Sequence, residues 1–216
     1  MRKRDVFSAA VRTGLVCALI AVPARLLAEP PPTPDFAGIP VDPYGQTPGY
    51  ECFNQEPSRP GSEQFRDMVL GAYPESASGD IWAPCNTHSP FSLHHAGRAW
   101  DWFITFPGNL ASDAERAVAD ELVNWLLEPV DGERHMRLRR LGITEIIWFD
   151  HIWTSESRRW HVYDLNGCPD PDVSNTTCHR DHVHFTFTVE GANGHTSWWL
   201  GLLGWWLAFL GNLFPR

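Results

Sequence analysis

The chain has 216 residues, of which 43% are hydrophobic and 20% are charged, and this length suits one domain with a buried core and appendages. Its formal net charge is −9 with the histidines neutral. Nucleic-acid binding needs clustered lysine and arginine to contact phosphates, so we expect no nucleic-acid partner.

The N-terminus has the features of a signal peptide. Four basic residues precede an apolar run at 15–22, and small residues offer cleavage sites after Ala24 or Ala28. The alternative is a membrane anchor, but the run is short for a bilayer crossing. Cleavage after Ala28 leaves 12 basic and 25 acidic residues, a net charge of −13. We therefore predict a secreted or extracytoplasmic protein.

Composition divides the chain into four parts. Residues 1–28 are the predicted signal peptide, and 29–49 form a proline-rich linker or lead-in. We expect the folded domain over 50–197, followed by a tryptophan-rich apolar segment at 198–216.

Four cysteines remain after processing, namely Cys52, Cys85, Cys168 and Cys178. An even number of cysteines in an exported chain indicates disulfides. Three pairings exist, and we favour 52–85 with 168–178 because the second closes a short loop rich in Gly, Pro and Asp. Zinc binding by cysteine is the competing interpretation, but no Cys-x-x-Cys pair is present.

The predicted elements then follow in chain order. Apolar residues at helical spacing predict a helix over 62–72, and a second helix begins at Ser112 with a capping box. A shorter helix is expected over 133–141. Residues 145–153 favour a hairpin, and 164–177 form a loop of turn residues.

The clearest strand covers 181–189, where apolar and polar residues alternate. The apolar set is Val183, Phe185, Phe187 and Val189, and the polar set is His182, His184, Thr186 and Thr188. Successive side chains of a strand point to opposite faces, so the apolar set faces a core and the two histidines point the same way.

These histidines belong to a predicted zinc site. Catalytic zinc takes three nitrogen or oxygen ligands from protein and keeps one open position. His94 and Asp101 are seven residues apart, and a short β-turn-β segment would bring both to one point, with the small Gly97 at the turn. His184 would complete the ligand set. We therefore predict an α+β domain whose small antiparallel sheet carries Zn²⁺ and packs helices on one face.

The motif Ser-x-His-x-x-Gly-x-Ala-x-Asp at 92–101, followed by His-x-His at 182–184, resembles a group of zinc metallopeptidases. That group includes D-Ala-D-Ala carboxypeptidases, D,D-dipeptidases, phage L-alanyl-D-glutamate endopeptidases and the hedgehog signalling domain. More narrowly, residues 97–102 and 181–184 resemble a family of secreted actinobacterial and fungal proteins. The likeness covers roughly 45–199 and implies the hedgehog/D-Ala-D-Ala peptidase fold.

The resemblance implies that His94, Asp101 and His184 bind zinc. It also implies that Asp181, three residues before the last ligand, is the general base. Strand alternation puts Asp181 on the face opposite His184, so this role requires the strand to bend or begin there. His182 shares the face of His184 and is the alternative base or oxyanion stabiliser.

Other residues are candidates for substrate contact. His179 lies where some relatives carry a histidine, five residues before the last ligand. Relatives also carry an arginine shortly before the first motif, where this chain has Ala83. Arg66 and Ser92 are our substrate-binding candidates, with Arg98 as an alternative to Arg66.

Two functions follow from these features. The first is an exported zinc metallopeptidase that hydrolyses amide bonds in peptidoglycan peptides, of the D,D-carboxypeptidase or endopeptidase type. The second is a non-catalytic, zinc-stabilised protein of the same fold that binds or supports the cell wall. In both cases we expect a monomer.

The apolar C-terminal segment has its own prediction. Residues 198–214 are uncharged, and as a helix they would span roughly 25 Å, which is short for a bilayer. Tryptophans are enriched at membrane interfaces, and this segment has four. We expect contact with a membrane surface; the alternative is a terminal helix docked on the domain.

Overall fold

The computed structural model describes residues 29–47, 49, 52, 57–88 and 91–201. Within them, six strands form one sheet in the order β1-β2-β6-β3-β4-β5, and all neighbouring strands are antiparallel. The strands are β1 (Ala77–Ser78), β2 (Ala99–Phe103), β3 (Ile143–Trp148), β4 (His151–Thr154), β5 (Trp160–Val162) and β6 (His182–Phe187). The predicted α+β class with an antiparallel sheet is confirmed.

The helices are α1 (Pro60–Ala72), the 3₁₀ helix η1 (Leu93–Ala96), α2 (Asp113–Leu127), α3 (Met136–Leu141) and α4 (Val189–Ala192). Helix α1 begins two residues earlier than predicted because Pro60 occupies the first turn, where its fixed φ is favourable. The capping box of α2 is present, formed by Ser112 and Glu115. Helix α3 begins three residues later than predicted, after a turn bridged by Val130 and Glu133.

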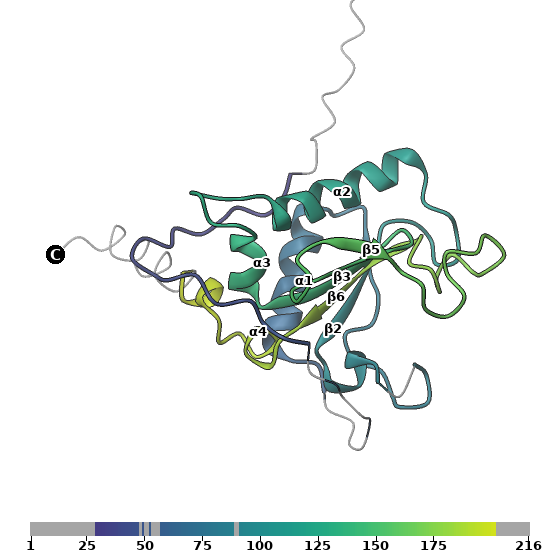
Figure 1. Ribbon diagram of the computed structural model, residues 1–216, viewed down its shortest axis with the longest axis horizontal. Coiled ribbons are helices and arrows are strands. Elements are labelled where there is room, and N and C mark those ends of the chain that lie inside the picture. Colours follow the sequence, from purple (N-terminus) through teal and green to yellow (C-terminus); the bar gives the residue numbers. More distant parts are fainter. Residues whose placement is uncertain (1–28, 48, 50–51, 53–56, 89–90, 202–216) are drawn as a thin grey trace, which may run out of the picture.

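The hydrophobic core lies between the helices and one face of the sheet. Phe65 of α1 packs edge-on against Trp100 of β2 and Phe185 of β6, at centroid distances of 5.7 and 5.2 Å. From α2, Leu122 and Leu126 are fully buried in the same core. In Figure 1, α1 crosses the strands and α2 runs along the top of the domain. The opposite face of the sheet carries polar side chains of β6 and, around Ile147, a small apolar cluster.

Strand β6 confirms the alternation as far as Phe187. Val183, Phe185 and Phe187 are at most 1% exposed. The prediction was wrong at Val189, which is 42% exposed. The strand ends because the Thr188 side chain caps α4 by accepting a hydrogen bond from the Gly191 amide.

Both predicted disulfides, Cys52–Cys85 and Cys168–Cys178, are formed. The second pair packs with Ile147 and Tyr163 in a small apolar cluster, which fixes the 164–177 loop against the sheet. Disulfides persist in oxidising surroundings, so the chain belongs in an extracellular or otherwise oxidising environment.

The proline-rich segment before residue 50 is extended, but it is not a detached linker. Phe36 is a core residue, and Ile39 and Tyr44 pack against the core. The guanidinium of Arg140 lies 4.0 Å from the centroid of the Phe36 ring and donates to the Ile39 carbonyl. The folded body therefore begins well before the predicted boundary at residue 50.

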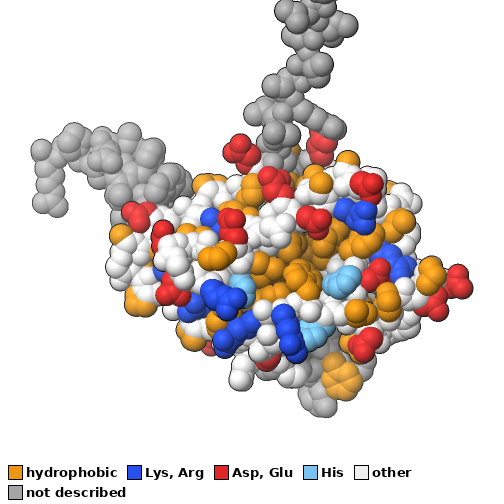
Figure 2. Space-filling view, turned by 45° about the horizontal axis from the view of Figure 1, so that its top comes forward, with side chains coloured by type: hydrophobic (Ala, Val, Ile, Leu, Met, Phe, Trp, Pro, Cys, Tyr) orange, Lys and Arg blue, Asp and Glu red, His pale blue; other side chains and the backbone are white. Residues whose placement is uncertain are grey.

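Arginine is the main positively charged residue on the protein surface, because Lys3 is the only lysine in the chain. Figure 2 shows arginines gathered beside hydrophobic side chains on one face, with acidic side chains spread around the rim. On α3, Arg137 donates to the Thr33 hydroxyl, and Arg139 donates to the Asp42 carbonyl. These contacts fasten the N-terminal segment to the domain.

The C-terminal segment is described only as far as residue 201. A helix begins at Ser197. Trp198 is fully buried, and its ring lies 5.5 Å from Phe36 and 5.9 Å from Trp125. These first residues dock on the domain, as the alternative prediction had it, while 202–216 lie outside the described residues. No described helix is long and apolar enough to cross a membrane.

Arg140 ties the N-terminal segment to the start of the C-terminal helix, because it also donates to the Ser197 hydroxyl at 2.7 Å. We expect Arg140→Met to lower the free energy of unfolding by about 2–4 kcal/mol, since buried acceptors lose their donor. Urea denaturation measures this change. The exposed Arg134→Met is the control, and an equal loss in both variants would contradict the assignment.

Candidate metal centre

The first histidine motif folds as a 3₁₀ turn. The Ser92 side chain caps this turn by accepting a hydrogen bond from the His94 amide. Gly97 ends it with φ of 64°, and a Cβ there would lie 2.2 Å from the Pro57 carbonyl oxygen, so glycine is required. The predicted β-turn-β geometry was wrong, because residues 93–96 form η1 and only the residues after Gly97 enter β2.

Strand pairing sets the other half of the site. Asp101 of β2 lies directly opposite His184 of β6 in the antiparallel register. Paired residues point to the same face, so both side chains leave the core face together. His184 Nδ1 is 2.8 Å from Asp101 Oδ1. His94 Nε2 lies 3.3 Å from that nitrogen and 3.4 Å from that oxygen.

These three atoms form a triangle whose dimensions suit a metal ion. Its sides are 2.8, 3.3 and 3.4 Å. Tetrahedral zinc with bonds of 2.0–2.1 Å separates its ligand atoms by about 3.3 Å. Imidazole nitrogens and carboxylate oxygens are among the ligands that zinc takes in proteins. His94, Asp101 and His184 therefore fit zinc in chemistry and in spacing.

The electrostatics keep Asp101 in its ligand form. Burial opposes ionisation of this carboxyl group, but the nearby His94 and His182 and a hydrogen bond from His184 outweigh it. Together they hold the pKa of Asp101 well below its usual range. The group is a carboxylate at neutral pH, as a metal ligand must be.

Asp181 lies next to the cluster but is not directed at it. Strand β6 begins at His182, and the fully buried Asp181 carboxylate accepts hydrogen bonds from His182 Nδ1 and the Gly108 amide, both at 2.6 Å, and from the Thr176 hydroxyl at 2.5 Å. Although burial opposes ionisation, these donors lower the pKa of Asp181. The side chain that lies at the cluster is instead that of His182, whose Nε2 is 3.6 Å from Asp101 Oδ1.

Two further histidines border the cluster. His88 stacks on His94 with ring centroids 4.7 Å apart. His179 lies 4.8 Å from His182 and 5.7 Å from His184, and its buried Nδ1 has no hydrogen-bond partner among the described residues. Burial, aided by these two histidines, lowers the pKa of His179 well below its ordinary value, so this ring is neutral.

The structure does not bring the arginine candidates to the cluster. Arg66 lies on α1, which covers the core face of the sheet, and it pairs with its neighbour Asp67. Arg98 is buried and donates twice to the Phe187 carbonyl. Of the substrate-binding candidates, only Ser92 adjoins the cluster, where it caps the turn that carries His94.

Sequence reasoning overlooked a polar chain that leads away from the metal-facing side of His184. His184 Nε2 lies 3.1 Å from Thr186 Oγ1, and this hydroxyl donates to Glu145 Oε1 at 3.2 Å. Burial raises the pKa of Glu145, opposed by His184 and the Thr186 hydroxyl. Alternation within the predicted hairpin was the available signal, because Glu145 is opposite Thr186 in the register.

Arg180 is a second residue that the sequence patterns did not single out. Its side chain holds the loop after β5 in place. This buried guanidinium pairs with Asp150 at 2.9 Å and donates to the Pro169 and Asp170 carbonyls. Asp150 and Phe149 form the two-residue turn of the β3–β4 hairpin, both with positive φ. The ion pair thus joins this hairpin to the segment that leads to His179.

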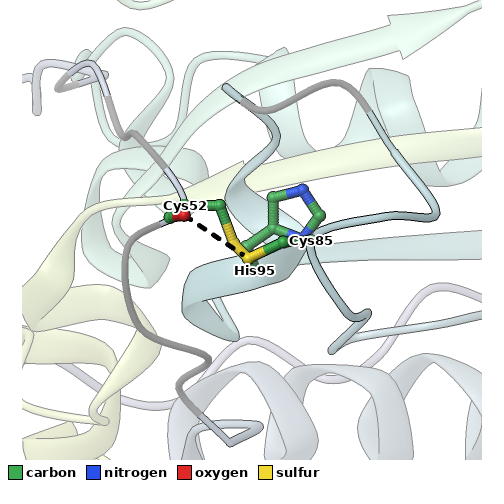
Figure 3. Close-up of side chains that lie close together, drawn as sticks. All are labelled: Cys52, Cys85 and His95. Carbon is green, nitrogen blue, oxygen red and sulfur yellow. Dashed lines mark hydrogen bonds between the residues drawn. A yellow bond between two sulfur atoms is a disulfide. The ribbon is translucent and has the colours of Figure 1, made fainter.

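A second group of potential ligands consists of Cys52, Cys85 and His95. Figure 3 shows that the two sulfurs form a disulfide beside the histidine ring. Disulfide sulfurs are not thiolates, so they do not offer metal ligands. His95 Nδ1 lies 2.8 Å from the Ala83 carbonyl and donates to it. The disulfide and the hydrogen bond between His95 and Ala83 therefore fix the segment before η1.

The cluster predicts one zinc ion per chain. His94→Ala should leave almost no zinc after dialysis, because His94 Nε2 forms two sides of the ligand triangle. Zinc at 100 times its dissociation constant should stabilise the wild type by about 2.7 kcal/mol. Elemental analysis and thermal unfolding measure both effects. His151→Ala, at an exposed ring, is the control, and zinc retained in His94→Ala would contradict the site.

Comparison with known proteins places the chain in a family. Residues 54–175, more than half of the chain, match the family described as VldE, C-terminal domain. This stretch contains His94 and Asp101 but ends before His184. No curated protein and no solved structure matches the chain. The chain belongs to the VldE C-terminal domain family.

Proposed function

We propose that the protein is an exported zinc metallopeptidase that hydrolyses amide bonds in peptidoglycan peptides. The observation that supports this most is the triangle of ligand atoms from His94, Asp101 and His184, with the side chain of His182 beside it. A metal site next to an oriented proton carrier is the arrangement that hydrolysis needs.

His94, Asp101 and His184 would hold the zinc ion. When bound, zinc supplies a Lewis acid that polarises a carbonyl group and acidifies water. The three side chains come from η1, β2 and β6, so two of them stand on paired strands. Sites on regular elements hold their geometry better than sites on loops.

His182 is the proton carrier in this proposal. Asp181 accepts the hydrogen bond from His182 Nδ1, which leaves Nε2 facing the cluster. Nε2 can take a proton from the attacking water and give it to the departing amine. Asp181 orients the ring and stabilises its charged form, as the carboxylate does in hydrolytic triads. The base role thus passes from Asp181, the sequence-based candidate, to His182.

The lone pairs of Asp181 explain this exchange of roles. Three donors, from His182, Gly108 and Thr176, already occupy its two oxygens. A carboxylate so engaged has a lowered pKa and is a poor proton acceptor. Gly108 and Thr176 belong to separate loops. Their hydrogen bonds fix the Asp181 carboxylate, and the carboxylate in turn fixes the ring of His182.

The substrate class rests on the sequence motifs. Residues 92–101 and 182–184 resemble peptidases that act on cell-wall peptides, and the two disulfides agree with an exported chain. The alternative is a non-catalytic, zinc-stabilised cell-wall protein. That alternative is favoured by Ala83, which stands where relatives carry arginine, and by Arg66, which does not reach the cluster.

Defined muropeptides analysed by mass spectrometry separate the two functions. The zinc-loaded wild type should cleave at least one amide linkage. His182→Ala should keep zinc and lower kcat by about 10²–10⁴-fold, the usual contribution of a general acid–base group. Asp181→Asn should also lower kcat, because an amide does not stabilise the charged ring.

Asp67→Asn, at an exposed position on α1, is the matched control and should cleave at the wild-type rate. If the wild type cleaves no muropeptide of any linkage, the non-catalytic function takes the place of our proposal. An unchanged rate in His182→Ala would instead leave hydrolysis standing and remove His182 from the mechanism.

A further inference from the structure

Glu145 is a partly buried carboxylate that the proposed hydrolysis does not use. It stands on β3, on the sheet face that carries the metal cluster, opposite Thr186 of β6. Burying a carboxylate is costly unless hydrogen bonds compensate it. The hydrogen bond described for its side chain comes from the Thr186 hydroxyl, at 3.2 Å. The hydrogen bond with Thr186 therefore indicates the role of Glu145.

The hydroxyl of Thr186 connects Glu145 to a metal ligand. A hydroxyl has one proton to donate and two lone pairs to accept with. Because the Thr186 proton is donated to Glu145, its oxygen accepts from His184 Nε2, 3.1 Å away. The proton on Nε2 of His184 is therefore held by Thr186. When zinc is bound, Nδ1, which lies 2.8 Å from Asp101 Oδ1 and 3.3 Å from His94 Nε2, would give its lone pair to the metal ion.

We infer that Thr186 and Glu145 are positioning residues that set the tautomer and ring orientation of His184 for the metal ion. The inference rests on the proposed zinc site and adds the residues that prepare it. Metal-ligating histidines generally donate their second N–H to a carboxylate, carbonyl or water, and loss of that partner weakens metal binding. In this chain a threonine carries the connection to the carboxylate.

The sheet fixes every member of this chain of hydrogen bonds. Thr186 follows His184 by two residues, so strand alternation puts both on one face. Glu145 is joined to them through the β3–β6 ladder, and Asp101 through the β2–β6 ladder. Three neighbouring strands thus carry the carboxylate, the hydroxyl, the histidine and the second carboxylate on one face of the sheet, in two adjacent register pairs.

Zinc affinity, measured by competition with a chromophoric chelator, tests the inference on the mature chain. Thr186→Val keeps the shape but removes the hydroxyl, and should weaken zinc binding by about 10–100-fold. Thr186→Ser restores the hydroxyl and should bind zinc nearly as the wild type does. Glu145→Leu should weaken binding in the same direction, because the proton of Thr186 is no longer held away from His184.

Thr154→Val is the matched control. Thr154 is also opposite Glu145, on β4, but its hydroxyl bonds to Ser157 and has no connection to His184. Its zinc affinity should equal that of the wild type. Equal affinity in Thr186→Val and the wild type, or an equal loss in Thr154→Val, would overturn the inference.

A second readout does not depend on zinc. In the zinc-free protein, ¹H–¹⁵N NMR should show a slowly exchanging Nε2–H of His184 in the wild type and in Thr186→Ser, but not in Thr186→Val. If that resonance is missing in the wild type, the positioning role is overturned. If the resonance is present and the wild type binds no zinc, the proposed function fails while the hydrogen-bond chain stands.

Discussion

The antiparallel pairing of β2 with β6 is the constraint on which the site depends. It sets Asp101 directly opposite His184, and on the other face it sets Trp100 opposite Phe185 in the core. A slip of one residue would turn every side chain of the strand to the wrong face, placing histidines in the core and aromatic rings in water. Packing of the hydrophobic core therefore fixes the register of β2 and β6, and this register places Asp101 and His184 side by side.

The two disulfides extend this control to the walls of the site. His88 follows Cys85 by three residues and stacks on His94, while His179 follows Cys178 directly and packs against His182. His88 and His179, which border the cluster, thus each lie in a segment that a disulfide fixes. The oxidising surroundings that preserve these bonds also preserve the shape of the cluster.

The sequence predicted those features that depend on local patterns. The alternation around His184 and the capping box at Ser112 need only neighbouring residues, and both are present in the structure. Features that depend on distant partners were missed. The Asp181 carboxylate is occupied in part by the Gly108 amide, 73 residues away, and no local pattern indicates that contact. For the same reason the packing of Phe36 against Arg140 was not foreseen.

We propose that three side chains, two of them on paired strands, form a zinc site. Diffraction from crystals of the zinc-treated mature protein, measured at the zinc absorption edge, tests it most directly. One anomalous peak is expected, about 2.0–2.1 Å from His94 Nε2, Asp101 Oδ1 and His184 Nδ1. A peak bound by other residues, or no peak while these three side chains keep their places, would contradict it.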